Sequence, residues 1–417
     1  MASAAIEAGL PARRSESLAA GMLIALIGAA VTLNYVDRGA MSVAAPLLKG
    51  ELHLSATRFG LASSAFFWTY VPCHLAIGWL CDRVPVTRLM ALGLALWAAA
   101  TVLTGFVGGF VGLVGLRLLL GVGESVAFPG AAKLIAMHAP TARRGIANSM
   151  IGVGLAFGPA IGTLGGGLIL AHWGWRPLFL VFGTATLLWL GPWLLVARRL
   201  GPGHPSAQAA PCPNRLLLRE RALWISCFAQ FCTNWGLYFT LTWLPLFLVQ
   251  QRGLPLTTMA VMAGATYGTN GVVSFVAGHL SDRAVARGVA EPGLRRALVT
   301  ASQTGYALGI TGMAFTSGTG PLWACLVLTG AASGLAYPNI NCIAQIFAGP
   351  RAAGGWVGIQ NGVANLAGVV GPTMVGIIVD ATGNFISAFV LSAGIALAAA
   401  ATWLFALPPI RRVIDQD

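Results

Sequence analysis

Four ionisable side chains stand inside long apolar stretches of the sequence. Asp37 and Arg38 are adjacent, and Arg117 and Glu124 are seven residues apart. Seven residues make about two helical turns, so Arg117 and Glu124 share one helix face, about 10 Å apart along the axis. A charge at the centre of a bilayer costs about 2.5–3.5 kcal/mol on insertion scales. Four such charges therefore require pairing or contact with water.

The chemistry open to these four groups is the binding of an anion and the transfer of protons. An arginine that faces an aqueous cavity can bind both oxygens of a carboxylate. A carboxylic acid removed from water holds its proton more readily, whereas a nearby arginine opposes protonation. An anion bound to that arginine would relieve the opposition. The four charges therefore predict anion uptake coupled to proton uptake; the alternative is that they form inert ion pairs that fix helix rotation.

The composition predicts an integral membrane protein. Of the 417 residues, 57% are hydrophobic and 9% are charged, against roughly 25% charged residues in a soluble domain. Twelve stretches are long and apolar enough to cross a bilayer as helices. They cover residues 19–47, 59–81, 89–107, 110–137, 145–171, 177–198, 222–250, 258–280, 296–316, 320–347, 353–379 and 384–407. The expected fold class is an all-α membrane protein with twelve transmembrane helices in two six-helix bundles.

The positive charge is distributed unevenly across these spans. Of the 25 Lys and Arg residues, 19 lie on the side that holds both termini, and four lie on the other side. The positive-inside rule predicts that both termini are cytoplasmic and that the protein is a multi-pass protein of the cell (inner) membrane. This asymmetry accounts for the net charge of +13 without a nucleic-acid partner.

Enzyme signatures are missing from the sequence. It contains no phosphate-binding loop, no metal-binding His-Glu spacing and no nucleophile elbow, so we expect neither an enzyme nor a bound cofactor or metal. The seven cysteines include no C-x-x-C pair and predict no disulfide framework.

The chain divides into two similar halves. A polar, proline-rich segment over residues 199–221 separates six spans from six. We therefore predict an N-terminal bundle over 1–198, a cytoplasmic linker over 199–221 and a C-terminal bundle over 222–417. The hexapeptide at 78–83 recurs at 278–283, and Gly-Pro pairs recur at 158–159 and 371–372. Parallel repeats of this kind place a substrate site near the midplane, between the halves.

The layout of six plus six spans and the repeated G-x-L-x-D-R loop resemble the major facilitator superfamily. In that superfamily the loop is a cytoplasmic gate. The resemblance gives a gating role to Gly78, Asp82, Arg83, Asp282 and Arg283. Asp82 and Asp282 would cap or pair with neighbouring helix ends.

A closer resemblance lies in the first and fourth spans. Asn-Tyr-Val-Asp-Arg at 34–38, Gly-Leu-Arg at 115–117 and Gly-Val-Gly-Glu at 121–124 look like the signature of the anion:cation symporter family. That family includes bacterial sugar-acid transporters, sialin and the vesicular glutamate transporters. The resemblance implies proton transfer by Asp37 and Glu124, a substrate carboxylate on Arg38, and Arg117 as a substrate-site residue paired with Glu124. It also implies substrate contacts from Tyr35, Tyr70, Gln230 and Asn361.

Two positions depart from the family pattern. His74 stands where sugar-acid transporters tend to have glutamine, and Leu155 aligns with a glutamine of some members. His74 is either a further titratable group or a neutral residue in a helix contact.

The second half supplies neutral polar groups in place of charges. Gln230, Asn234 and Tyr238 recur every four residues along one face of the seventh span. Further amides in later spans are Asn270, Asn339, Asn341, Gln360, Asn361 and Asn365. Each could serve only as polar contact between helices, but together they predict a wall that binds hydroxyl groups. An anion-binding half that faces such a wall suits a polyhydroxylated monocarboxylate.

We therefore expect a monomeric secondary active transporter that works by alternating access. Its partners would be a small anionic substrate, protons and membrane lipid. The expected activity is proton-coupled symport of an organic anion, most simply a sugar acid such as a hexonate or hexuronate. Proton-coupled uptake of an aromatic or dicarboxylic acid, proton-driven drug export and a membrane-embedded enzyme or sensor remain alternatives, and coupling to sodium stays open.

Overall fold

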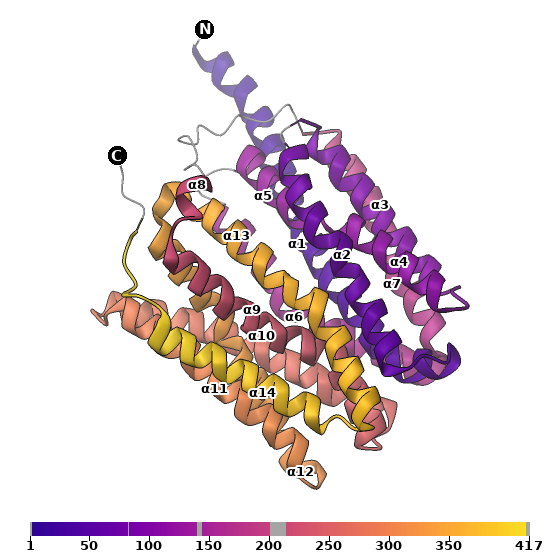
Figure 1. Ribbon diagram of the computed structural model, residues 1–417. Coiled ribbons are helices and arrows are strands. Elements are labelled where there is room, and N and C mark those ends of the chain that lie inside the picture. The colour runs from indigo at the N-terminus through magenta and orange to yellow at the C-terminus, as the bar shows by residue number, and fades with distance from the viewer. Residues whose placement is uncertain (1, 82, 140–143, 201–213, 414–417) are drawn as a thin grey trace.

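Helices occupy all twelve predicted spans in the computed structural model, which describes residues 2–81, 83–139, 144–200 and 214–413 (Figure 1). The first half consists of α1 (Ala2–Glu51), α2 (Ala56–Leu80), α3 (Val86–Thr104), α4 (Phe110–Glu124), α5 (Ala127–His138), α6 (Arg144–Trp173) and α7 (Trp175–Ala197). The second half consists of α8 (Asn214–Leu217), α9 (Arg221–Leu246), the π-helical turn η2 (Phe247–Gln251), α10 (Leu256–Ala286), α11 (Glu291–Phe315), α12 (Thr319–Gly334), α13 (Ala336–Thr382), α14 (Ile386–Ala401) and the π-helical turn η3 (Thr402–Ala406).

Two of the predicted spans are built from two successive α-helices. The fourth span is α4 followed by α5, and the tenth is α12 followed by the first part of α13. The long helix α13 also contains the eleventh span, and the two parts are separated at Gly349, where φ is 67°. Glycine has no Cβ and adopts this left-handed conformation readily, so the chain can change direction there.

Eight helical stretches of the described chain are long and apolar enough, by length and composition, to cross a membrane. The helices that fall outside this set, α2, α9, α10 and α11, carry more polar residues within their spans. Three of them line the central cavity described below, which gives those polar residues an interior position. The expected all-α fold of two six-helix bundles is confirmed, and Figure 1 shows the bundles side by side.

The internal repeat is visible in how the helices pack. A methyl group on Gly121 of α4 would overlap the carbonyl oxygen of Phe66 in α2, and a methyl group on Gly330 of α12 would overlap that of Thr266 in α10. Small residues allow helices to approach this closely in membranes. An equivalent glycine contact therefore holds α4 against α2 in the first half and α12 against α10 in the second half.

The two bundles meet most extensively along two helix pairs, α2 with α13 and α6 with α10. Gly60 and Gly376 lie against the backbone of the opposite helix in the first pair, and Gly167 and Gly271 do so in the second. The contacts of Gly60 and Gly376 lie in the half of α2 and of α13 that is farther from the chain termini. The bundles are therefore closed against each other at the end opposite the termini.

A carboxylate reinforces this closure. Asp380, near the end of α13, accepts hydrogen bonds from the backbone N–H groups of Ala56 (2.8 Å) and Thr57 (2.7 Å), at the start of α2. The N-terminus of a helix carries a partial positive charge and unpaired N–H groups, which favour a carboxylate there. We call this contact between Asp380 and the first turn of α2 the Asp380 latch.

The linker predicted over 199–221 stays a prediction, because residues 201–213 lie outside the described chain. The flanking residues are described: α7 ends at Ala197, and α8 and α9 begin at Asn214 and Arg221. The bundle boundaries 1–198 and 222–417 stay predictions for the same reason.

Candidate substrate cavity

A cavity of about 460 Å³ lies between the two bundles, on the termini side of their contact. From the first half it is lined by Tyr35, Arg38, Tyr70, His74, Phe128, Gly152, Leu155, Ala156 and Pro159. From the second half it is lined by Asn234, Leu237, Tyr238, Thr240, Thr266, Tyr267, Asn270, Ser274, Thr329, Gly330, Ser333, Tyr337, Pro338, Asn341, Asn361 and Asn365. Arg38 is the formally charged residue in this lining, and no acidic side chain contributes to it.

Arg38 sits in the wall of the cavity and is held in place from behind. Its side chain is 8% exposed, and its Nε donates a 3.0 Å hydrogen bond to Oε2 of Glu124, which is fully buried. The guanidinium carbon lies 5.0 Å from the ring centroid of Tyr35 and 4.7 Å from that of Tyr70. Such cation–π contacts fix the direction of the guanidinium. Its Nη2 has no hydrogen-bond partner among the described residues, which leaves capacity for an anion.

The ion pair of Glu124 differs from the one expected. We predicted Arg117 as its partner, but Arg38 is the residue in contact, and no ion pair joins Arg117 to a carboxylate among the described residues. The reason is geometric. Two turns of one helix separate Arg117 and Glu124 by about 10 Å, whereas α1 brings Arg38 directly beside Glu124.

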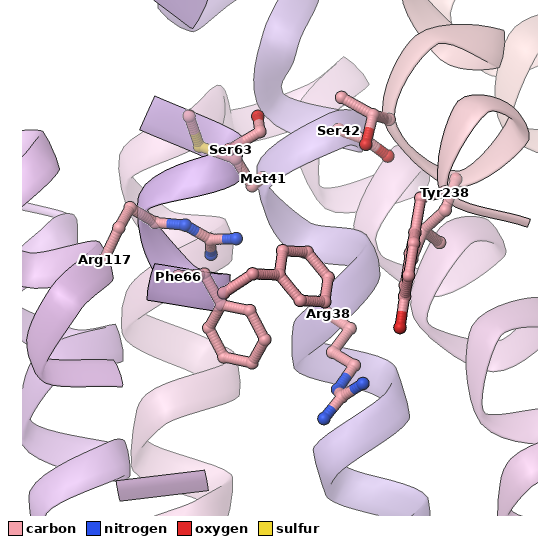
Figure 2. A pocket seen from close by; sticks show the side chains of 10 residues that line it. Arg38, Met41, Ser42, Ser63, Phe66, Arg117 and Tyr238 are labelled. Atoms are coloured by element: carbon pink, nitrogen blue, oxygen red, sulfur yellow. The ribbon is translucent and has the colours of Figure 1, made fainter. Parts of the chain in front are cut away.

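Arg117 lines a second, much smaller pocket. This pocket, of about 30 Å³, is lined by Arg38, Met41, Ser42, Ser63, Phe66, Phe67, Arg117, Tyr238, Leu241 and Thr242 (Figure 2). The Phe66 ring contacts both guanidinium groups, 5.2 Å from Arg38 and 5.4 Å from Arg117. Arg38 therefore belongs to both spaces, while Arg117 does not line the large cavity.

Asp37 lies behind the cavity rather than in its wall. It is 2% exposed and accepts hydrogen bonds from Nε1 of Trp97 in α3 (2.6 Å) and from Oγ1 of Thr186 in α7 (3.4 Å). Its other carboxyl oxygen has no hydrogen-bond partner among the described residues. We did not foresee Trp97 or Thr186. The available signal was a tryptophan in the middle of an apolar span, since a buried indole N–H usually finds an acceptor.

The neutral wall of the second half is only partly as predicted. Asn234, Tyr238 and Asn361 line the cavity, as do Asn270, Asn341 and Asn365. Two tyrosine hydroxyls bind amides of this wall: Tyr238 donates to Asn365 (2.5 Å), and Tyr337 donates to Asn234 (2.6 Å). The wall is therefore organised by phenol–amide pairs.

Gln230 does not line the cavity. It donates to Oδ1 of Asn361 (2.6 Å) and accepts from Gln360 (2.7 Å), and Gln360 accepts from Trp356 (2.9 Å). Gln230 thus orients the amide of Asn361 from behind and is not part of the cavity wall. Asn339 is likewise outside the lining, because its side-chain oxygen accepts from Arg295 (3.2 Å).

The repeated loop motif lies at the termini end of the bundles. Asp282 accepts a 2.7 Å hydrogen bond from Arg295 in the first turns of α11, which agrees with the expected pairing to a neighbouring helix end. Arg83 stacks over Trp79, with its guanidinium carbon 3.7 Å from the ring. Gly78 and Arg283 are exposed. Asp82 lies outside the described residues.

Comparison with known proteins places the chain in a family. Residues 27–290 and 289–416 match the family model described as the Major Facilitator Superfamily. The chain belongs to the major facilitator superfamily. It is therefore a multi-pass membrane transporter rather than an enzyme.

Relatives within this superfamily carry names of organic-anion transporters. The chain is similar to a probable sulfoacetate transporter of Cupriavidus necator, with 30% identity over 90% of this chain and 91% of the relative. It is also similar to two Bacillus subtilis proteins, a probable galactarate/D-glucarate transporter (28% identity, 92% and 90% covered) and a hexuronate transporter (28% identity, 91% and 92% covered).

A solved structure shares the fold. It is a bacterial homologue of the human lysosomal transporter Spinster, in an inward-facing and occupied conformation, and it aligns with a TM-score of 0.78. The alignment covers 92% of this chain and 96% of that one at 17% identity. This likeness concerns the fold alone.

Proposed function

We propose that this superfamily member is a proton-coupled symporter of a small organic anion, with sugar acids as the substrate class. The observation that carries the proposal is the position of Arg38. It is a guanidinium in the wall of a central cavity, fixed from behind by a buried carboxylate 3.0 Å away. A buried ion pair with one partner in the wall of a cavity can exchange its other partner for a ligand.

The coupling follows from competition for Arg38. A substrate carboxylate that binds the guanidinium replaces Glu124 as its counter-ion. Glu124, which is fully buried, then lacks the positive neighbour that favours its charged form and takes up a proton. Substrate and proton thereby enter together, and the loaded site carries no unpaired buried carboxylate.

Asp37 supplies a second proton position. It is buried on the side of α1 that faces α3 and α7, away from the cavity, and the Trp97 and Thr186 donors hold one of its oxygens. The protonation of Asp37 would therefore respond to the conformation of the N-terminal bundle rather than to direct contact with the substrate. Arg117, across Phe66 from Arg38, contributes positive potential to the same bundle.

Alternating access is the mode of transport we propose. The bundles are in contact at the end opposite the termini, where the Asp380 latch lies, and the cavity occupies the other half. With both termini in the cytoplasm, as the charge distribution predicts, this arrangement is the inward-facing state. The motifs at Gly78–Arg83 and Gly278–Arg283 would then act at the cytoplasmic gate.

Sugar acids fit the composition of the wall. Asparagine amides at Asn234, Asn270 and Asn341 can bind hydroxyl groups, and five of the six tyrosines line the cavity. Two of the relatives described above are named for sugar acids, and the third is named for another small organic acid. A second candidate is an aromatic acid, which the tyrosine rings and Phe128 would also accommodate.

Substitution of Glu124 tests the coupling between substrate and proton. Glu124→Gln keeps the shape of the side chain and an oxygen for Arg38 but cannot take up a proton. In proteoliposomes, this variant should lose accumulation of a sugar acid driven by a proton gradient and should retain part of the exchange of labelled for unlabelled acid. Glu51→Gln is the matched control, because Glu51 binds Arg176 (2.8 Å) outside the cavity. Loss of both activities in Glu124→Gln alone, or of neither, would contradict the role given to Glu124.

A further inference from the structure

His74 lies in the wall of the large cavity, one turn along α2 from Tyr70. Its ring centroid is 5.4 Å from that of Tyr70, with 34° between the ring planes. Nδ1 of the imidazole has no hydrogen-bond partner among the described residues. An unpaired buried polar atom is destabilising, so a ligand that pairs with it removes this unfavourable contribution.

The Tyr70 ring connects His74 to Arg38. The guanidinium carbon of Arg38 is 4.7 Å from the centroid of this ring, and the imidazole is 5.4 Å from it. The two nitrogen-bearing groups therefore lie at most about 10 Å apart on the same wall, with one aromatic ring shared between them.

The surroundings of the imidazole leave it without an anionic partner. The groups that face it are the Arg38 guanidinium from α1, the Tyr70 ring from its own helix and the backbone of Ser125 after α4. No acidic side chain lines the cavity, and Glu124, the nearby carboxylate, is already bound to Arg38. A protonated imidazole in this position would be stabilised by a negative charge, which a ligand in the cavity can supply.

We propose that His74 is a specificity-determining residue that binds a second anionic group of the substrate. The preferred substrate is then a small acid with two anionic ends, one on Arg38 and the other on His74, with its hydroxyl groups facing the amide wall. This inference rests on the proposed function and narrows its substrate class from small organic anions to acids that carry two anionic groups.

The size of the site agrees with such a ligand. Each charge-assisted hydrogen bond adds about 3 Å to the reach of a carboxylate. Acids with about two to six carbon atoms can therefore place one anionic group at each of the two cationic side chains. Because both side chains belong to the first bundle, a dianion would be held by that bundle alone, and the second bundle would contact only its neutral part.

Matched acids test the proposal. D-Glucarate and D-gluconate share a hydroxylated six-carbon chain and differ only in whether the last carbon is a carboxylate, and tartrate and threonate form the same pair with four carbons. The measurement is the affinity of each acid for purified protein and its uptake into proteoliposomes at pH 6. Wild-type protein should bind the diacid of a pair at least about tenfold more tightly than the monoacid, which corresponds to about 1.4 kcal/mol.

His74→Gln keeps a hydrogen-bonding side chain of similar size but cannot be protonated. This variant should bind the diacids no better than the monoacids. In wild-type protein alone, the preference should also fall as the pH is raised, because only the protonated imidazole attracts the second anionic group. The pH series needs no variant, so it tests the proposal even if His74→Gln does not fold.

The role of His74 and the proposed transport function would be contradicted by different results. A preference for diacids that survives in His74→Gln, or that is constant across the pH series, would overturn the role of His74 while leaving acid transport intact. If wild-type protein binds none of these four acids and does not bind D-glucuronate either, the proposed transport of sugar acids itself fails.

Discussion

The Asp380 latch joins the two bundles in the state described here, and removing its charge should shift the balance between conformations. The carboxylate accepts two backbone hydrogen bonds, of 2.8 Å and 2.7 Å, from the first turn of α2. Asp380→Asn retains one acceptor oxygen, so it loses one of these bonds and the favourable interaction with the helix N-terminus. A hydrogen bond to a charged group contributes about 1.5–3 kcal/mol.

Asp380 is exposed, which favours the lower end of this range. A loss of about 1.5 kcal/mol corresponds to roughly a tenfold change in an equilibrium constant. Because the latch can form only while the bundles are closed at this end, the substitution should raise the population that is open there by about tenfold.

Thiol labelling measures this population. Thr242 is buried and lines the small pocket between the large cavity and the closed end. In a background without the seven native cysteines, Thr242→Cys should react about ten times faster with a membrane-impermeant thiol reagent when Asp380→Asn is present. The reagent is applied on the face of the membrane opposite the termini.

Glu51→Gln is the control, since Glu51 binds Trp175 (2.6 Å) and Arg176 (2.8 Å) within a single bundle at the same end of the protein. An equal labelling rate with and without Asp380→Asn would refute the latch. An equal increase from Glu51→Gln would show that loss of any carboxylate at this end loosens the fold, and it would refute the specific role of Asp380.

Two further substitutions test the interior of the first bundle. Trp97→Phe removes the 2.6 Å donor to Asp37, so Asp37 should keep its proton to higher pH, and the pH profile of proton-driven uptake should move by about one unit toward alkaline values; an unchanged profile would mean that Asp37 takes no part in coupling. Gly121→Ala places a methyl group against the backbone of α2, whereas Gly115→Ala on the same helix meets nothing within 4 Å. The first should destabilise the protein by about 1–3 kcal/mol and lower its melting temperature, the second should not, and equal melting temperatures would contradict the close α2–α4 contact.

The fold was predictable because its main signal is local. A run of about twenty apolar residues must be helical in a bilayer, whatever packs around it. Each of the twelve spans could therefore be located from composition alone. The division of the fourth span after Glu124 and that of the tenth span after Gly334 were not predicted. They depend on backbone conformation at single residues, and apolar patterning carries no information about it.

Which residues line the cavity could be predicted better than which side chains bind each other. Arg38, Tyr35, Tyr70, Asn234 and Asn361 line the cavity as expected. The partner of Glu124 was misassigned, because spacing along one helix says which residues share a face but not which neighbouring helix comes closest. Gln230 shares a face with Asn234 in the sequence pattern, yet its amide is bound by Gln360 and Asn361.

The most direct test of anion transport concerns Arg38. Purified protein can be heated with D-gluconate, D-glucuronate or D-glucarate and, in parallel, with the uncharged amides of the same acids. Stabilisation by at least one acid, without stabilisation by its amide, is the predicted result for wild-type protein, and Arg38→Ala should abolish it. If Arg38→Ala is stabilised by the acid as strongly as wild-type protein, the carboxylate does not bind at Arg38, and the proposed mechanism is wrong.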